Sequence, residues 1–299
     1  MAHVIKNVAI VGAAGSLGSV IFEKLLAAGV FNVRVLRRVG SKSTFPSGIS
    51  VVDIDYGSPA SLKAALDGQD AVVVTLAGSF ADQLPLIDAA VAAGVQRFIP
   101  SSFGSNLDNA KSRQLPVFGD KNKTHDKLVE VSQNSGLSFT EVYNNAFLDW
   151  GLEKDFLLRI SDYKPLLIDG GDLPFSATTL GSVADAVVGI LKNPEGTKNK
   201  GLFIHDLVIT QNQLLALAKR AAPDKPWEPQ VVKLDDLIPG ANERLAKGMY
   251  DMETFAPFLF QAIMVPGYGG KFERVDNELL GLKGKTEEDV VEILKQLIH

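Results

Sequence analysis

Three glycines near the start of the chain have the spacing of a phosphate-binding turn. Gly12, Gly15 and Gly18 follow the apolar run 8–11 and precede a helix predicted over 19–28. Gly12 would allow a tight turn, Gly15 would let the backbone approach a pyrophosphate, and Gly18 would let the helix pack close to the strand. The free N–H groups at the helix start would then face the anion. The pattern predicts a dinucleotide cradle, although a glycine-rich turn without a ligand would show the same residues.

Two arginines follow the next predicted strand, residues 32–36. They are Arg37 and Arg38, with Lys42 shortly after and no acidic residue nearby in the sequence. In dinucleotide-binding folds, an acidic residue here holds the ribose 2′-OH of NAD, whereas a basic residue accommodates the 2′-phosphate of NADP. A guanidinium suits a phosphate because it is a planar fork of donors with a fixed charge. The sequence therefore favours NADP; the alternative is a basic strand end that is merely solvated.

A lysine is the candidate for proton chemistry. None of the five tyrosines has a lysine four residues later, so the usual Tyr-x-x-x-Lys pair of short-chain dehydrogenases is absent. Lys121 lies near the start of a helix predicted over 118–130, where the helix dipole and partial burial both favour a neutral amine. Such an amine can donate or accept a proton or polarise a carbonyl. His125 lies one turn further along the same helix face. The alternative is an ordinary charged helix surface.

These residues need a parallel sheet to bring them together. Further strands are predicted over 49–55, 71–76, 97–100 and 138–143, with helices over 59–66 and 82–93 between them. Alternating strands and helices predict an α/β, Rossmann-like, doubly wound parallel sheet. Ligands of such sheets bind outside the carboxyl ends of the strands. The cofactor-binding residues predicted at these ends are Gly12, Ala14, Gly15, Ser16, Leu17, Gly18, Arg37, Lys42, Leu76, Ala77, Gly78, Ser101 and Phe103.

Composition excludes several other kinds of protein. The 299 residues carry a net charge of −5, which disfavours non-specific nucleic-acid binding. The absence of cysteine excludes disulfides, thiolate zinc sites and cysteine nucleophiles. The histidines show no metal-ligand spacing, so no metal is expected; they are His3, His125, His205 and His299. No apolar run approaches the roughly 20 residues that cross a bilayer, and no signal peptide is recognisable. We therefore expect a cytoplasmic protein without a membrane partner.

The motifs, taken in order, resemble the NmrA-like and isoflavone-reductase-like family of atypical short-chain dehydrogenases, which includes phenylcoumaran benzylic ether reductases. The matching stretches are the glycine motif 12–18, Leu36-Arg37-Arg38, residues 97–104 (family R-F-I-P-S-E-F-G, with Ser102 in place of the acid), Phe118-Gly119-Asp120-Lys121 (family F-x-x-K), Asn144-Asn145-Ala146-Phe147 (family S-N-x-F) and residues 276–282. The resemblance covers nearly the whole chain.

The resemblance implies an NADPH-dependent reductase of a small, aromatic or secondary metabolite with a ketone, enone, imine or benzylic ether group. It assigns Lys121 as the catalytic residue that also contacts the cofactor, with Lys123 as the competing candidate. It adds Asn145 and Phe147 to the cofactor site, where Phe147 would pack against the nicotinamide. The family also contains non-catalytic NADP-binding redox sensors, which are the alternative, and it leaves a homodimer open. Residues 148–150 and Ser102 depart from the plant enzymes, so plant substrates are not implied.

The chain is expected to divide into an NADP-binding part, residues 1–155, and a smaller α+β part, residues 156–299, that is mainly substrate-binding. Some segments of the second part are expected to return to the core sheet, among them a helix over 178–191 in which Asp185 would cap or bond the backbone. Aromatic residues gather between 226 and 268. They would either line an apolar substrate pocket or form the core of the smaller part.

Overall fold

A seven-stranded parallel sheet forms the centre of the molecule. The computed structural model describes residues 4–78 and 80–298; His3 and His299, considered above as metal ligands, lie outside these ranges. The strand order is β10-β6-β5-β4-β1-β2-β3, and every pairing in it is parallel. The strands are β1 (Asn7–Val11), β2 (Asn32–Arg38), β3 (Ser50–Ile54), β4 (Ala71–Val74), β5 (Arg97–Ile99), β6 (Ser138–Tyr143) and β10 (Lys200–Phe203). The predicted doubly wound, Rossmann-like sheet is confirmed.

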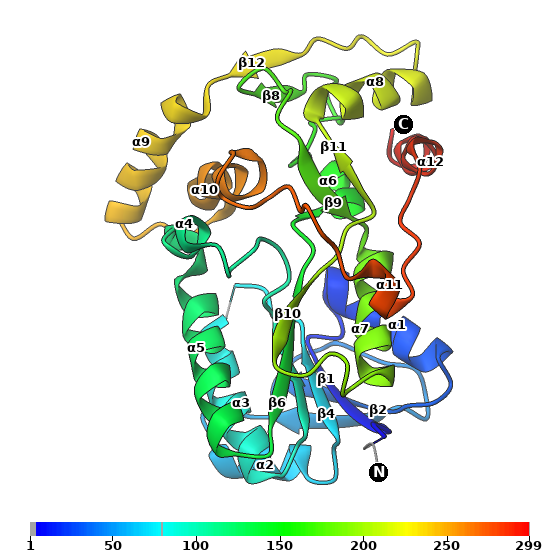
Figure 1. Cartoon of the computed structure of the whole chain (residues 1–299), viewed down its shortest axis with the longest axis vertical. Coiled ribbons are helices and arrows are strands. Elements are labelled where there is room, and N and C mark those ends of the chain that lie inside the picture. Colours follow the sequence, from blue (N-terminus) through cyan, green and yellow to red (C-terminus); the bar gives the residue numbers. More distant parts are fainter. Residues whose placement is uncertain (1–3, 79, 299) are drawn as a thin grey trace.

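Helices cover both faces of this sheet because successive side chains of a strand point to opposite faces. Val8 and Ile10 of β1 belong to an apolar cluster with one pair of helices, whereas Ala9 and Val11 belong to a second cluster on the other face. Figure 1 shows the two layers flanking the sheet. The helices of the first face are α1 (Ser16–Ala27) and α7 (Leu180–Lys192); those of the second are α2 (Pro59–Leu66), α3 (Gln83–Ala92) and α5 (Gly119–Asn134).

A second apolar core lies beyond the carboxyl ends of the strands, in the upper half of Figure 1. Two small sheets, β11-β9-β7 and β12-β8, belong to this half. Their strands are β7 (Ala146–Phe147), β8 (Leu166–Ile168), β9 (Phe175–Thr178), β11 (Leu207–Ile209) and β12 (Gln230–Val232). The remaining helices are α4 (Ala110–Arg113), α6 (Leu148–Glu153), α8 (Gln211–Ala221), α9 (Leu234–Ala246), α10 (Met252–Met264), α11 (Asn277–Leu280) and α12 (Glu287–Leu297), with 3-10 turns η1 (Phe80–Asp82) and η2 (Pro116–Phe118).

The chain crosses between the two cores several times. Ala146, Leu148 and Leu152 belong to the second core, whereas α7 and β10 pack in or against the main sheet. The helix predicted over 178–191 begins later, at Leu180, because Thr178 pairs in β9 and the Thr179 side chain accepts the Ser182 N–H as the helix cap. Asp185 does not cap or bond the backbone as predicted. It pairs with Lys24 at 2.8 Å and so joins α7 to α1.

Two negative findings apply to the described residues. No helix among them is both long and apolar enough to span a bilayer. No cluster of three or more His, Asp or Glu side chains within 4–78 and 80–298 could hold a metal ion.

Candidate active site

The glycine turn leaves the start of α1 open. Gly12 adopts φ +82°, and the Gly15 N–H donates to the Gly12 carbonyl at 2.9 Å, which closes a tight turn. Gly15 is the N-cap residue, and no side chain caps the helix there. The first backbone N–H groups of α1 therefore face outward at the carboxyl end of β1, where the helix dipole favours an anion.

Glycine is required at these three positions for different physical reasons. A Cβ on Gly12 would lie 2.5 Å from the Thr75 carbonyl oxygen, and one on Gly18 would lie 2.1 Å from the Gly12 carbonyl oxygen. Both positions therefore serve close packing of strand, turn and helix. A Cβ on Gly15 would meet a single atom within 4 Å, the Gly12 carbonyl oxygen at 3.3 Å, so its other sides would be open at the start of the helix. This is the arrangement expected for a pyrophosphate that contacts the backbone.

Other predicted cofactor residues lie around this turn. Leu17 and Phe147 pack against the apolar cluster that contains Phe103. The loops after β4 and β5 are tied together, because the Ser101 hydroxyl donates to the Leu76 carbonyl at 2.8 Å. Ala14, Ser16, Ala77 and Gly78 are exposed on the described surface. The structure thus brings the ends of β1, β4, β5 and the β7 strand to one region.

Lys121 turns its amine inward from the start of α5. The side chain is partly buried; Nζ donates to the Phe103 carbonyl at 2.7 Å and lies 5.0 Å from the centre of the Phe80 ring. Burial lowers the pKa of Lys121 to about 8, while the charge of Glu141 acts in the opposite direction. The direction is the one predicted from the sequence. A neutral or readily deprotonated amine beside Phe103 can exchange a proton with a bound molecule near neutral pH.

Lys123, the competing candidate, points away from this region. Its side chain is 68% exposed, and Nζ pairs with Asp120 at 2.9 Å. The two lysines therefore lie on different faces of α5, and only Lys121 reaches the ends of the strands.

Arg37 already has an acidic partner. Its Nε and Nη2 donate to Asp53 at 2.6 and 3.0 Å, and Nη1 donates to the Ser43 carbonyl at 2.8 Å. The hydrogen bond to Asp53 raises the pKa of Arg37 and lowers that of Asp53. No acidic residue lies near Arg37 in the sequence, but one lies beside it in the structure. The register of β2 and β3 places Asp53 directly opposite Arg37. Lys42 is exposed. A role for Arg37 and Lys42 at a 2′-phosphate stays a prediction.

Arg38 faces a polar cavity of about 550 Å³ at the carboxyl ends of β2 and β3. Its guanidinium lies 5.1 Å from the Tyr56 ring centre, and Nη2 donates to Asp82 at 2.6 Å. Burial raises the pKa of Tyr56 to about 12. The cavity is lined by Arg38, Val39, Ile54, Asp55, Tyr56 and Asp82. Sequence analysis missed Asp55, Tyr56 and Asp82, although the first two directly follow β3 and so stand where ligands of such sheets bind.

Comparison with known proteins agrees with this arrangement. The model of the NmrA-like family matches residues 5–256. The chain belongs to the NmrA-like family. It is 36% identical over 292 residues to oxidoreductase aprR of Aspergillus flavus, which covers 95% of this chain and 97% of that protein. The resemblance drawn from the motifs is therefore confirmed.

Solved structures show the same fold. AtPrR2 with NADP+ and (+)pinoresinol is 22% identical, with a TM-score of 0.79 over the whole of both chains. An isoflavone reductase is 21% identical, with a TM-score of 0.78 over 98% of this chain and 100% of that one. At this level of identity the likeness concerns the fold alone, which is the doubly wound parallel sheet predicted from the strand and helix order.

The side chains of Asn144 and Asn145, in the motif shared with the NmrA-like family, hydrogen-bond to backbone groups. Asn145 adopts φ +49°, and its Nδ2 donates to the Ser176 carbonyl at 2.9 Å. Its Oδ1 is buried with no hydrogen-bond partner among the described residues, as is the hydroxyl of Ser102. Asn144 accepts the Gly104 N–H at 2.8 Å and so ties this loop to the one after β5. Asn145 therefore joins the two cores, and its contact with a cofactor stays a prediction.

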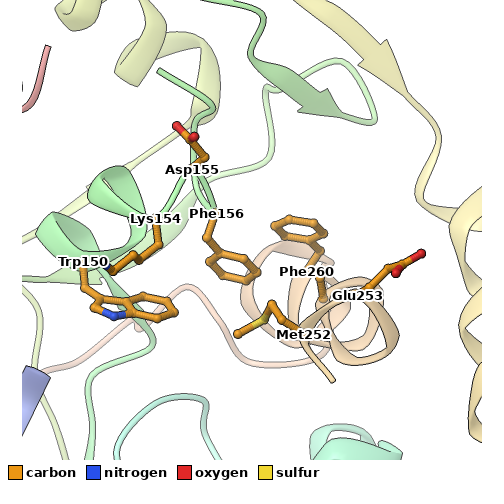
Figure 2. Close-up of a pocket in the computed structure, with 8 residues that line it drawn as sticks. Trp150, Lys154, Asp155, Phe156, Met252, Glu253 and Phe260 are labelled. Carbon is orange, nitrogen blue, oxygen red and sulfur yellow. The ribbon is translucent and has the colours of Figure 1, made fainter. Parts of the chain in front are cut away.

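An apolar pocket of about 330 Å³ opens between α6 and α10, as Figure 2 shows. The Phe156 and Phe260 rings stack with centroids 4.8 Å apart and planes inclined by 11°. Trp150 and Met252 add apolar surface from the two helices. The complete lining is Trp150, Lys154, Asp155, Phe156, Met252, Glu253, Ala256 and Phe260.

Some aromatic residues between 226 and 268 therefore line a pocket and others form a buried core, so each of the two expected roles applies to part of this region. Phe260 lines the pocket, whereas Phe258 on another face of α10 is buried in a cluster with Phe118 of η2. Since η2 immediately precedes α5, the helix that lines the pocket also packs against the start of the helix that carries Lys121.

Proposed function

We propose that this chain is an NADPH-dependent reductase of a small apolar metabolite. The uncapped start of α1, with a position at Gly15 that a Cβ would fill, is the observation that carries the proposal. The NmrA-like family, the oxidoreductase relative and the fold shared with NADP+-bound AtPrR2 support it. When bound, the cofactor would supply a hydride.

The chain's own residues would do the rest. The turn at Gly12, Gly15 and Gly18 would hold the pyrophosphate, Arg37 the 2′-phosphate, and Phe147 the nicotinamide ring. Lys121 would give a proton to the reduced substrate or stabilise the negative charge that develops on it, because its amine is held inward and titrates near pH 8. No metal is needed for this chemistry.

The pocket between α6 and α10 supports the substrate class. Flat rings such as Trp150, Phe156 and Phe260 favour planar, apolar molecules, which stack on aromatic faces and lose little hydration on binding. We propose that this pocket holds the non-reacting part of an aromatic or similarly apolar ketone, enone, imine or benzylic ether.

The test is NADPH oxidation followed by fluorescence with a panel of such compounds. Turnover of at least one aromatic member supports the reductase. If no compound is reduced, and the oxidised and reduced cofactors bind with clearly different affinities, the chain is a redox sensor instead. If neither cofactor binds, both functions are wrong.

Charge reversal at Arg37 is expected to change cofactor preference. Arg37→Glu should weaken NADPH binding by about 10–100-fold, the effect of losing charged hydrogen bonds to a phosphate, and should change NADH binding much less. Fluorescence titration with both cofactors measures this. Asp53→Asn is the matched control: it frees Arg37 from its ion pair and should leave NADPH binding unchanged or tighter. If the ratio of the NADPH and NADH affinities is unchanged in Arg37→Glu, Arg37 does not contact the cofactor.

A further inference from the structure

A buried carboxylate lies on the strand beside the Lys121 amine: a Cβ on Gly104 would lie 3.8 Å from Lys121 Nζ, and Gly104 pairs with Tyr143, two residues after Glu141. Glu141 is in β6, its side chain is 1% exposed, and its charge favours the protonated form of Lys121. One oxygen, Oε2, is bonded by His125 Nδ1 at 2.6 Å and by the Tyr143 hydroxyl at 3.0 Å. The other, Oε1, is buried with no hydrogen-bond partner among the described residues.

His125 is the hydrogen-bond partner of this carboxylate on α5. It stands one helical turn after Lys121, with its side chain 20% exposed, and its ring makes an edge-to-face contact with Phe139. The hydrogen bond to Glu141 raises the pKa of His125, which favours the protonated imidazole. A buried carboxylate is costly unless it is paired or hydrogen-bonded, and His125 supplies that partner.

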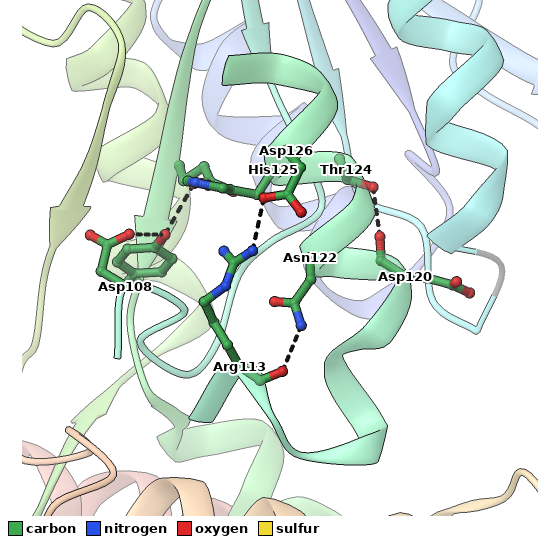
Figure 3. A network of polar contacts seen from close by, with 9 residues as sticks. Asp108, Arg113, Asp120, Asn122, Thr124, His125 and Asp126 are labelled. Atoms are coloured by element: carbon green, nitrogen blue, oxygen red, sulfur yellow. Dashed lines mark hydrogen bonds and ion pairs between the residues drawn. The ribbon is translucent and has the colours of Figure 1, made fainter. Parts of the chain in front are cut away.

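Figure 3 shows His125, Asp108 and Arg113 in the polar network around the first half of α5. The Tyr143 hydroxyl lies 3.1 Å from Asp108 and 3.0 Å from Glu141, but a single hydroxyl hydrogen can serve only one carboxylate at a time. Burial and both carboxylates raise the pKa of Tyr143, so it stays neutral. Tyr143 therefore contributes a dipole, whereas His125 and Lys121 are the neighbours of Glu141 that can carry a positive charge.

The other charges packed against α5 act weakly on the pair or are engaged elsewhere. Arg113 disfavours and Asp108 favours protonation of His125. On the side of η1 and α3, Asp82 pairs with Arg38 and Asp88 pairs with Lys127. Arg113 itself pairs with Asp126 at 2.8 Å.

We propose that Glu141 and His125 are positioning residues that together control how strongly Lys121 holds its proton. Glu141 supplies a negative charge behind the amine, and His125 limits that charge by pairing with it. The proposal rests on the proposed role of Lys121 for its use in catalysis, but not for its electrostatics. Neither residue belongs to the F-x-x-K or S-N-x-F motif that identified the family.

Two charge-neutralising variants are expected to shift the pKa of Lys121 in opposite directions. Glu141→Gln removes the negative charge and should lower the pKa of Lys121 by about one unit. His125→Gln keeps a hydrogen-bond donor but removes the cation, so the unbalanced carboxylate should raise the pKa of Lys121. A general loosening of the structure would move both variants the same way.

The measurement is competitive labelling of Lys121 with acetic anhydride across pH, read by mass spectrometry in the substrate-free protein. Glu130→Gln, the same chemical change at an exposed position of α5, is the control and should not shift the titration. Shifts of the Lys121 pKa in opposite directions in the two variants support the proposal. No shift, or shifts in the same direction, would overturn the proposal. If Glu141→Gln does not fold, His125→Gln decides alone: a rise supports the proposal, and no change or a fall rejects it.

The pH profile of kcat/KM then separates the two proposals. If Lys121 is the catalytic group, the pKa of the basic limb of this profile should shift in each variant by as much as the pKa of Lys121 measured by labelling. Opposite labelling shifts without any change in the profile would keep the Glu141–His125 pair and reject the catalytic role of Lys121.

Discussion

Replacing Lys121 by methionine is expected to lower turnover by about 10²–10⁴-fold, the usual contribution of one proton-transferring side chain. Methionine keeps an unbranched apolar chain of similar length, so the packing of the side chain can largely remain. What is lost is the amine that donates to the Phe103 carbonyl and would meet the substrate. Because the pyrophosphate cradle lies on a different element, NADPH binding should stay within a few-fold.

The matched control is Lys123→Met on the same helix. Lys123 is exposed and paired only with Asp120, so turnover should remain close to that of the unmodified protein. Steady-state kinetics and NADPH titration of both variants decide the matter. Equal activity of Lys121→Met and the unmodified protein would contradict the catalytic assignment, even if the protein proves to be a reductase.

The choice between the two lysines shows what local sequence can predict. Position in the helix suggested that Lys121 would be near the strand ends, and resemblance to F-x-x-K favoured it over Lys123. The burial that lowers its pKa depends on Phe103 and Phe80, which come from separate loops. Periodicity gave the helix and its face, but the depth of burial follows from how α5 packs on the sheet.

Contacts across the sheet were the main part that could not be predicted. Asp53 meets Arg37 because β2 and β3 pair in a particular register, and Glu141 meets His125 because α5 packs on β6. Both carboxylates look like ordinary strand residues in the sequence. Although each pair is only 16 residues apart, its contact depends on the register between two elements or on how a helix packs on a strand, which no local pattern specifies.

The crossing of the chain between its two cores was only partly foreseen. Helix α7 was expected to return to the main sheet, and it does. Ala146, Leu148 and Leu152, which the expected boundary at residue 155 assigned to the first part, are buried in the second core, whereas Phe147 between them packs against the first. Their apolar side chains fit either environment, so hydrophobicity alone could not distinguish the two cores.

Adding one methyl group at Gly18 is expected to damage the fold, whereas the same change at Gly15 should act mainly on cofactor binding. The Gly18→Ala Cβ would lie 2.1 Å from a backbone oxygen and 2.6 Å from the Thr75 hydroxyl, so the strand and helix must separate. Overpacking of this kind costs about 1–3 kcal/mol or more, and the melting temperature should fall by several degrees. Calorimetry of the apoprotein measures this effect.

Gly15→Ala should lower the melting temperature less than Gly18→Ala, because Gly15 has φ −80° and its Cβ would meet only the Gly12 carbonyl oxygen, at 3.3 Å. Alanine is a poorer N-cap than glycine, which accounts for the loss that remains. The methyl group would also crowd the start of α1, and NADPH affinity should fall by about 10–100-fold through lost backbone hydrogen bonds to the pyrophosphate. Gly181→Ala, in α7 with no atom within 4 Å of the added Cβ, is the control: it should leave NADPH affinity unchanged and should not lower the melting temperature. Unchanged NADPH affinity in Gly15→Ala would mean that the turn is only a packing device, and the cofactor proposal would then lose the geometry on which it rests.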